Sequence, residues 1–337
     1  MIGSVLAGRY EILEVLGQGG MAVVYKARQK GSDQPIAIKM LHEDLITDDN
    51  ALKQFEQEEM AISRLNHPHV VRVFEIGATG QARPYIATEL IEGASLESVL
   101  KEVGHLPVGV SLSIFSQATS GLAHAHQQGV IHRDLKPSNL MLIANTNGES
   151  IFVKIVDFGI ANLMFLEESQ RSDSKRDKIV GSPLYMSPEQ CRGENLDVRS
   201  DIYSLGCVMY KTVTGNAPFN GKDLTELLNK QINELPASFQ VACPELQLPR
   251  KLESMIFRSM AKDRADRYQS MNELRRDILA LSKKYSVEAD SVTISVQEAD
   301  SAYGPGLALG ESYELPHDDE GLMQRQPLED TTQIGDD

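Results

Sequence analysis

The sequence predicts an α+β protein in which most strands come before most helices. Residues 9–29 alternate apolar and polar side chains on either side of a glycine cluster, which is typical of a strand–turn–strand hairpin. A third strand is expected at 35–40, and one amphipathic helix at 49–66 lies within this early part. Beyond residue 106, apolar residues recur at helical spacing, which predicts helices at 107–127, 200–214, 223–233, 249–261 and 270–284.

The composition is that of a globular protein. The 337 residues are 41% hydrophobic and 24% charged, enough to bury one large or two medium cores. No run of about 18 apolar residues predicts a membrane span, and residues 1–8 lack the basic start of a signal peptide. The three cysteines are an odd number without metal-ligand spacing, so we expect reduced, structural thiols and a cytoplasmic protein.

The negative charge is concentrated at the end of the sequence. The net charge is −15, and residues 285–337 hold 13 acidic side chains against the single base Arg325. Because the apolar periodicity also fades there, we expect an acidic, mostly disordered tail. The rest of the chain is close to neutral and has no basic stripe, so nucleic acid is not an expected partner.

The glycine cluster Gly17-Gln18-Gly19-Gly20-Met21-Ala22 closes the predicted hairpin. Backbone that passes over a phosphate needs glycines because a side chain would block the approach, although an ordinary tight hairpin explains the cluster equally well. The following strand ends near Lys39, which alone could be a lysine with its stem on apolar surface.

The predicted helix 49–66 places a carboxylate on its apolar stripe. Glu58 follows Phe55 by three residues and precedes Ile62 by four, whereas Glu59 is rotated off the stripe. A carboxylate facing a core needs a cationic partner, and Lys39 is the candidate. Helix capping or a surface ion pair is the alternative. His67-Pro68-His69 then ends the helix as a structural turn, and strands follow at 70–76 and 85–90.

Residues 132–139 read His-Arg-Asp-Leu-Lys-Pro-Ser-Asn between the apolar runs 129–131 and 140–143. Such runs predict buried strands, so the polar residues lie on a connection between rigid walls. Asp134, Lys136 and Asn139 can offer a proton acceptor, a cation and a metal ligand to one point, which is what phosphoryl transfer needs. A second predicted strand, 151–156, leads into Asp157-Phe158-Gly159, where an aspartate could reach the same metal.

These motifs resemble the eukaryotic-type (Hanks-type) Ser/Thr protein kinases, in particular their bacterial branch. The resemblance covers residues 8–280 and includes the glycine cluster, Lys39, the 132–139 loop, Asp157-Phe158-Gly159, Ser187-Pro188-Glu189 and 201–206. It implies the bilobal protein kinase fold, with an N-lobe at 8–91, a mostly helical C-lobe at 92–284 and the tail at 285–337. It also implies transfer of phosphate from ATP, with Mg²⁺ (or Mn²⁺), to Ser or Thr of protein substrates.

The resemblance assigns roles to individual residues. Asp134 would be the catalytic base, Lys136 would offset charge, Lys39 fixed by Glu58 would hold the phosphates, and Asn139 with Asp157 would hold the metal. Asp201 would brace the catalytic loop, and Arg267 would pair with Glu189. Thr88 would lie at the back of the adenine pocket and Glu89-Leu90-Ile91 would form the hinge between the lobes. The nucleotide contacts would come from Leu16, Gly17, Gln18, Gly19, Gly20, Met21, Ala22, Val24, Ala37, Lys39, Thr88, Glu89, Ile91, Ser95 and Met141.

Two positions depart from the family pattern. Ala22 stands where the family has the third glycine, from which we expect a stiffer glycine loop that still binds nucleotide. Ser187 stands where the family has alanine, and the glutamate of that motif is kept.

Regulation and partners follow as hypotheses. Arg133 could pair with a phosphate on Ser169, Ser172 or Ser174 in the polar stretch 165–180, which is otherwise a plain solvated loop. Thr331-Thr332 in the tail could dock a phosphopeptide-binding partner, although a solubilising tail explains the composition. A non-catalytic scaffold with the kinase fold and a small-molecule phosphotransferase are the alternative functions.

Overall fold

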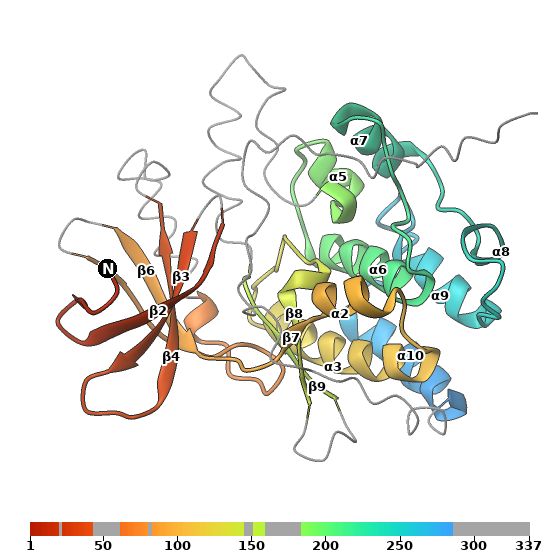
Figure 1. The fold of residues 1–337 in the computed structure, drawn as a ribbon. Helices are drawn as coiled ribbons and strands as arrows, with labels where there is room; N and C mark the ends of the chain where they lie inside the picture. The colour runs from red at the N-terminus through yellow and green to blue at the C-terminus, as the bar shows by residue number, and fades with distance from the viewer. Residues whose placement is uncertain (20–21, 43–60, 80–82, 145–150, 159–182, 286–337) are drawn as a thin grey trace, which may run out of the picture.

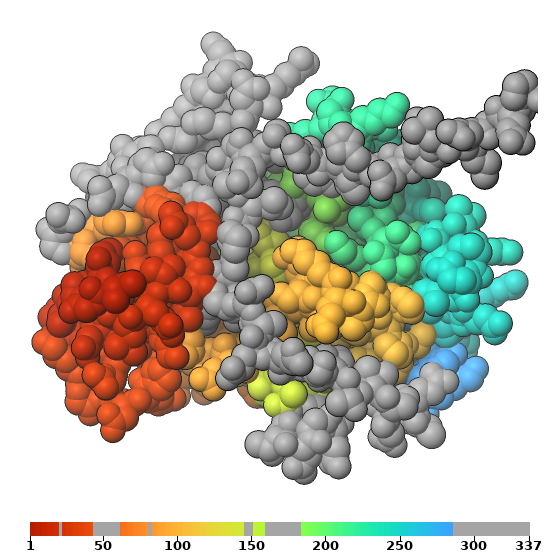
Figure 2. All heavy atoms as spheres, in the orientation of Figure 1, coloured from red at the N-terminus to blue at the C-terminus, as the bar shows by residue number. Residues whose placement is uncertain are grey.

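The computed structural model describes residues 1–19, 22–42, 61–79, 83–144, 151–158 and 183–285 (Figure 1). A β-sheet formed by the N-terminal part lies on one side, and the helices lie on the other. The space-filling view shows the same division, with red and orange atoms of the sheet on one side and green-to-blue atoms of the helices on the other (Figure 2). This is the bilobal arrangement that the sequence predicts.

The N-terminal sheet is antiparallel and has the strand order β1-β2-β3-β4-β6-β5. Its strands are β1 (Val5–Leu6), β2 (Tyr10–Gln18), β3 (Ala22–Gln29), β4 (Pro35–Leu41), β5 (Val73–Ala78) and β6 (Pro84–Glu89). The predicted hairpin is β2–β3, and its register pairs Gly17 with Val24 after an irregularity at Leu16. Alternate side chains of these strands, including Tyr10, Ile12, Tyr25 and Ile38, are buried in one cluster, because successive strand residues point to opposite faces.

The strands predicted at 70–76 and 85–90 are present with shifted boundaries. Residues 70 and 71 bond to the C-lobe instead: Val71 N–H donates to the carbonyl of Ile155 at 2.9 Å, and Val70 forms an isolated bridge with Ile155. The strand therefore begins at Val73, because the preceding residues connect the two parts of the molecule.

A small second sheet has the order β7-β8-β9, formed by β7 (Ala94–Ser95), β8 (Leu140–Ala144) and β9 (Ile151–Ile155). Strands β8 and β9 match the apolar strands predicted at 140–143 and 151–156, whereas the strand predicted at 129–131 is wrong, because these residues connect α3 (Val108–Gln127) to the loop without strand pairing. Strands β8 and β9 pair so that Leu140 lies opposite Ile155. The residues just before β8 and just after β9 therefore emerge at the same end of the sheet, which brings Asn139 and Asp157 to one region.

The helices form the larger part of the described chain. They are α2 (Leu96–Val103), α3 (Val108–Gln127), α5 (Pro188–Cys191), α6 (Val198–Thr214), α7 (Leu224–Asn233), α8 (Phe239–Ala242), α9 (Arg250–Ser259) and α10 (Met271–Tyr285), with the 3₁₀ turns η2 (Pro137–Asn139) and η3 (Pro183–Tyr185). Helices α3, α6, α7, α9 and α10 confirm the five predicted after residue 106; the short α2, α5 and α8 were not predicted.

Helix α6 is the centre of the helical core. Fourteen of its 17 residues are buried, as its apolar sequence predicts. Asp197 caps its N-terminus by accepting from Arg199 N–H, and Gly215 ends it in the left-handed conformation at φ 78°. Gly206 permits the crossing with α9, because a Cβ there would lie 2.7 Å from Cγ of Met260.

Three further predictions concern the described part of the chain. Residues 61–63 are the described end of the helix predicted at 49–66. The cysteines are free thiols, with Cys207 and Cys243 buried and Cys191 partly buried. Among the helices described here, none combines the length and apolar character needed to cross a membrane.

Candidate active site

The loop at 132–139 is anchored by a buried carboxylate of α6. Asp201 accepts the backbone N–H of His132 at 2.8 Å and of Arg133 at 2.9 Å. Its Oδ2 also lies 2.7 Å from Nε2 of His126, in the last turn of α3. Burial works against the ionised form, but the hydrogen bond from His126 and the nearby donors prevail and lower the pKa of Asp201.

The anchoring holds Arg133 in an unusual backbone conformation. Its φ is 66°, a region that a residue with a side chain rarely adopts. Both of its backbone groups are fixed: the N–H by Asp201 and the carbonyl by Nε2 of Gln190, at 2.6 Å. The loop is thus held from α6 on one side and from α5 on the other, immediately before Asp134.

The three polar residues that the sequence predicts to converge are bonded to one another. Lys136 Nζ lies 2.9 Å from Oδ2 of Asp134, and Asn139 Nδ2 donates to the backbone carbonyl of Asp134 at 2.7 Å. Burial opposes the charge on Lys136, but the carboxylate of Asp134 outweighs it and raises the pKa of Lys136. The lysine is therefore a cation beside the carboxylate at neutral pH.

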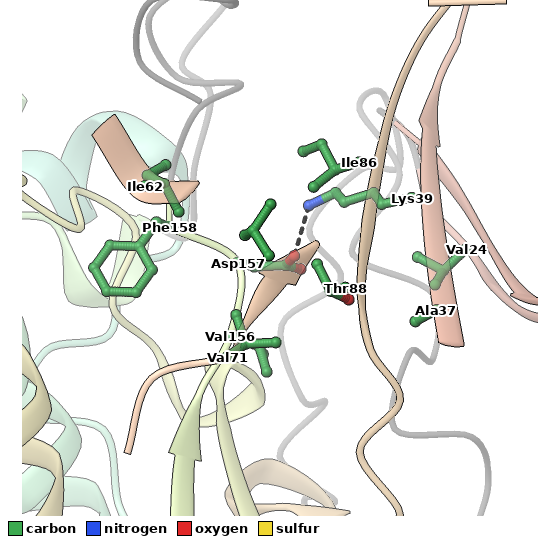
Figure 3. Close-up of a pocket in the computed structure, with 11 residues that line it drawn as sticks. Val24, Ala37, Lys39, Ile62, Val71, Ile86, Thr88, Val156, Asp157 and Phe158 are labelled. Carbon is green, nitrogen blue, oxygen red and sulfur yellow. Dashed lines mark hydrogen bonds and ion pairs between the residues drawn. The ribbon is translucent and has the colours of Figure 1, made fainter. Parts of the chain in front are cut away.

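Asp157 and Lys39 face each other across the mouth of a pocket between the two lobes (Figure 3). Lys39 Nζ lies 2.8 Å from Oδ1 of Asp157. Desolvation would raise the pKa of Asp157, but the ammonium group of Lys39 outweighs it and lowers that pKa. Asp157 has φ 53°. Phe158 is buried beside His132, with the two rings 4.7 Å apart.

The donor set fits Mg²⁺. The amide nitrogen of Asn139 is engaged with Asp134, which leaves its carboxamide oxygen as the atom for a cation, and Asp157 offers a carboxylate. Mg²⁺ prefers oxygen ligands and is commonly held by one or two protein groups together with substrate phosphates.

The pocket itself is mainly apolar. It is lined by Val24, Ala37, Lys39, Ile62, Val71, Val73, Ile86, Thr88, Val156, Asp157 and Phe158. Four predicted nucleotide contacts, Val24, Ala37, Lys39 and Thr88, are therefore on its wall (Figure 3). Apolar walls with a few charged groups at one end suit an aromatic base joined to phosphates.

Four other residues predicted at the nucleotide have the following contacts within the protein. Met141 and Ile91 are buried and pack with the wall residues Val71 and Val156. The side chain of Glu89 forms an ion pair with Lys154 and accepts the N–H of Arg72 at 2.7 Å. Ser95 is buried as the N-cap of α2, where its hydroxyl accepts the N–H of Ser98 at 3.0 Å.

The glycine loop is described at both of its ends. Leu16, Gly17 and Gln18 end β2, and Gly19 N–H donates to the carbonyl of Ala22 at 2.9 Å. Ala22 is buried and packs with Leu41 and Ile86, so its methyl group belongs to the core of the lobe. Six predicted site residues lie outside the described residues: Gly20, Met21, Glu58, Ser169, Ser172 and Ser174.

Glu189 of α5, the helix that contacts the 132–139 loop, forms a buried ion pair with Arg267. Arg267 holds Glu189 with two hydrogen bonds, of 2.7 and 2.8 Å, and Ser200 donates to the same carboxylate at 2.8 Å. Arg267 is 1% exposed and Glu189 2%. Burial would raise the pKa of Glu189, but Arg267 and Ser200 lower it. This is the pair that the family resemblance implies.

Sequence reasoning missed two residues that act on the loop. His126 was not singled out, yet it bonds to Asp201 and only 8% of its side chain is exposed. Gln190 was not singled out, although it caps α5 in a capping box with Ser187 and reaches the carbonyl of Arg133. The Ser-x-x-Gln spacing at 187–190 signals the capping box. No local pattern indicates that His126 meets a residue 75 positions later.

The fold is that of a protein kinase domain. The chain belongs to the protein kinase domain family, whose model matches residues 10–281. The resemblance to Hanks-type Ser/Thr kinases of bacteria is thereby confirmed, because the curated relatives are bacterial proteins with that name. The matches do not favour the scaffold or the small-molecule phosphotransferase.

Two curated relatives and one solved structure illustrate the similarity. A probable serine/threonine-protein kinase of Clostridium perfringens is 36% identical over 89% of this chain and 41% of its own length. Serine/threonine-protein kinase PknB of Mycobacterium tuberculosis is 33% identical over 97% of this chain and 50% of its own length. The crystal structure of the Mycobacterium tuberculosis PknI kinase domain is 25% identical, with a TM-score of 0.65, and the match covers 83% of this chain and 98% of that one. The chain spans about half or less of the length of these curated relatives.

Proposed function

We propose that this protein transfers the γ-phosphoryl group of ATP to Ser or Thr residues of proteins, including its own, in cytoplasmic signalling. The observation that supports it most is that three polar residues of one loop lie together. Asp134 contacts both Lys136 and Asn139, while Asp201 and Gln190 fix the loop's backbone. Because phosphoryl transfer depends on positioning and electrostatics, such a fixed arrangement is what the reaction requires.

The nucleotide would lie in the apolar pocket between the lobes. Val24 and Ala37 would contact the adenine from the N-lobe, and Lys39 would hold the α- and β-phosphates. Asn139 and Asp157 would hold Mg²⁺ or Mn²⁺, which neutralises phosphate charge when bound. Lys39 would exchange its contact with Asp157 for the phosphates and for Glu58, which the family resemblance assigns to it.

The acceptor hydroxyl would meet Asp134. Its oxygen forms a bond to the γ-phosphorus, the bond from that phosphorus to the β–γ bridging oxygen breaks, and ADP leaves. The hydroxyl proton goes to the carboxylate of Asp134. Lys136, held 2.9 Å from that carboxylate, would offset the negative charge on the transferred group.

Phosphate incorporation from radiolabelled ATP–Mg²⁺ tests this function. Wild type should label itself or a mixture of Ser- and Thr-containing proteins, and Asp134→Asn should lose at least about 100-fold of that rate. Equally low labelling by wild type and Asp134→Asn would contradict the proposed kinase activity. Labelling of aminoglycosides or choline-like compounds without any protein would indicate the small-molecule reaction instead.

The 165–182 segment would carry the regulation. A phosphate on Ser169, Ser172 or Ser174 would pair with Arg133, whose backbone is already fixed beside Asp134. Active protein analysed by mass spectrometry should carry phosphate between 165 and 182. Fully active protein without phosphate there would contradict this mechanism.

The acidic tail would add a partner. Phosphorylated Thr331 or Thr332 would dock a phosphopeptide-binding domain. Removing residues 286–337 should then abolish capture of such a partner while leaving phosphorylation of added substrates intact. Unchanged capture would instead favour a solubilising tail.

A further inference from the structure

A buried glutamine joins helix α7 to the turn η3. Gln231 lies in the last turn of α7 and is fully buried. Its Nε2 donates to the carbonyls of Pro183 at 3.1 Å and Leu184 at 2.8 Å, and its Oε1 accepts the hydroxyl of Tyr203 at 2.6 Å. Carbonyl oxygens can only accept, so these partners fix the orientation of the amide.

All three carbonyls of η3 are held by side chains from other elements. Gln231 holds those of Pro183 and Leu184, and Ser204 of α6 donates to that of Tyr185 at 2.7 Å. A turn of three residues makes few hydrogen bonds of its own. The position of η3 therefore depends on α6 and α7.

A lysine fixes the other side of Gln231. Lys262 Nζ donates to Tyr203 Oη at 2.9 Å and to the backbone carbonyls of Gln231 at 2.7 Å and Lys230 at 3.3 Å. It also lies 4.1 Å from the ring centre of Phe219. A cation at the carbonyl end of a helix is favourable, so Lys262 secures the last turn of α7.

The chain continues from η3 to the catalytic loop within a few residues. Ser187 caps α5, and Gln190 of α5 donates to the carbonyl of Arg133, which precedes Asp134. Hydrogen bonds thus join α7 to η3, the chain leads from η3 into α5, and α5 is hydrogen-bonded to the backbone of the residue before Asp134. Helices α5 and α7 lie next to each other above α6 (Figure 1).

We propose that Gln231 is a positioning residue for the protein acceptor. It holds residues 183–185, which lead into α5, and α5 contacts the loop one residue before Asp134. An acceptor whose hydroxyl reaches Asp134 would pass beside this segment, so the placement of α7 would become part of acceptor recognition. The proposal rests on the protein kinase activity proposed above. Gln231 is absent from the lining of the nucleotide pocket, so its loss should affect the acceptor and spare ATP.

The test replaces Gln231 by methionine, which has similar length and no hydrogen-bonding amide. The probe is the best acceptor that wild type selects from Ser- and Thr-containing peptides with randomised flanks. In Gln231→Met, the KM for this peptide should rise about five- to tenfold, because two carbonyls and a hydroxyl lose their partner. The KM for ATP and the rate of ATP hydrolysis without peptide should change less than about twofold.

Two further variants keep the result interpretable. Thr225→Met changes an exposed residue of the same helix and should behave as wild type. Tyr203→Phe removes the hydroxyl that bonds to both Gln231 and Lys262 but keeps the bonds of Gln231 to η3, so it should raise the same peptide KM by a smaller factor. It also provides the test if Gln231→Met does not fold.

The proposal fails if Gln231→Met keeps the wild-type peptide KM and flank preference. It also fails if peptide phosphorylation and ATP hydrolysis fall by the same factor, since that indicates a general loss of structure. If wild type phosphorylates no protein or peptide, the proposed function itself is wrong. The variants test only the role of Gln231.

Discussion

Lys39 and Asp157 form a direct ion pair in the pocket between the lobes, with Nζ and Oδ1 2.8 Å apart. They are separated by 118 positions and come from different lobes, so the pair sets the distance between the lobes at this point. Each is also assigned to a different part of the nucleotide, the lysine to phosphate and the aspartate to metal. When ATP–Mg²⁺ binds, Lys39 would contact the phosphates and Asp157 would contact the metal. The ion pair between the two residues would therefore have to break, and it would compete with nucleotide binding.

Lys39→Met should abolish phosphoryl transfer while preserving the fold. The lysine is partly exposed, so methionine costs little stability, but the α- and β-phosphates lose their cation. We expect a fall in kcat/KM of at least about 100-fold and a melting temperature within about 3 °C of wild type. The matched control is Lys26→Met, because Lys26 lies on the neighbouring strand and pairs with Glu14. Equal loss in both variants would mean that lysine charge in general, not Lys39, is required.

Ala22→Gly should weaken the N-lobe without abolishing nucleotide binding. The methyl of Ala22 packs with Leu41 and Ile86, and glycine in a strand also costs backbone entropy. We expect the free energy of unfolding to fall by about 1 kcal/mol, with the KM for ATP changed less than about threefold. Denaturant unfolding and steady-state kinetics measure the two quantities. Ala78→Gly, at an exposed strand end, should cost less. A large gain in ATP affinity would contradict this prediction and show that the stiffening expected from Ala22 weakens nucleotide binding.

The sequence predicts the fold and most of the site because both depend on local patterns. Apolar alternation locates β2, β3, β4, β8 and β9, and the all-round burial of α6 follows from its composition. The roles of Asp134, Lys136 and Asn139 are suggested by their spacing within one loop. Spacing did not indicate that Ser95 caps α2 or that Met141 packs with Val71 and Val156, and the nucleotide contacts assigned to both stay predictions. These contacts depend on residues that are distant in the sequence, and the spacing of a motif does not indicate them.

The contact between His126 and Asp201 is the kind of relationship that local patterns miss, and it makes a kinetic prediction. His126→Phe removes the hydrogen bond that helps to lower the pKa of Asp201, so that pKa should rise. A carboxylate with a lowered pKa keeps the loop anchored in acid, so the variant should lose activity at a higher pH than wild type as the pH falls. At neutral pH we expect kcat to fall about tenfold.

The measurement is kcat against pH at saturating ATP, together with the KM for ATP, which should stay constant. His124→Phe is the control, because His124 lies one half-turn earlier and stacks on His67 with the rings 5.3 Å apart. Its acid limb should coincide with that of wild type. If kcat falls at the same acid pH in wild type and both variants, protonation of Asp201 does not cause that fall.

The buried pair of Glu189 and Arg267 should contribute to the acid sensitivity of the C-lobe. Glu189→Gln leaves the guanidinium of Arg267 buried without its carboxylate, which should cost about 3–5 kcal/mol of unfolding free energy at pH 7. The folded pKa of Glu189 is lowered, so the unfolded state binds more protons in acid. The stabilisation is therefore complete above the ordinary glutamate pKa of 4.5 and is lost as the pH falls below it.

Urea unfolding at pH 7 and at pH 4 measures both effects, and the difference between wild type and Glu189→Gln should shrink at the lower pH. Glu194→Gln serves as the control, because Glu194 pairs with Arg264 at the surface, where 46% of its side chain is exposed. Solvent screens that pair, so its loss should cost less than about 1 kcal/mol at either pH. A difference between wild type and Glu189→Gln that stays constant between pH 7 and pH 4 would show that Arg267 stabilises the lobe mainly through its bonds to the carbonyls of Ala261, Arg199 and Lys262.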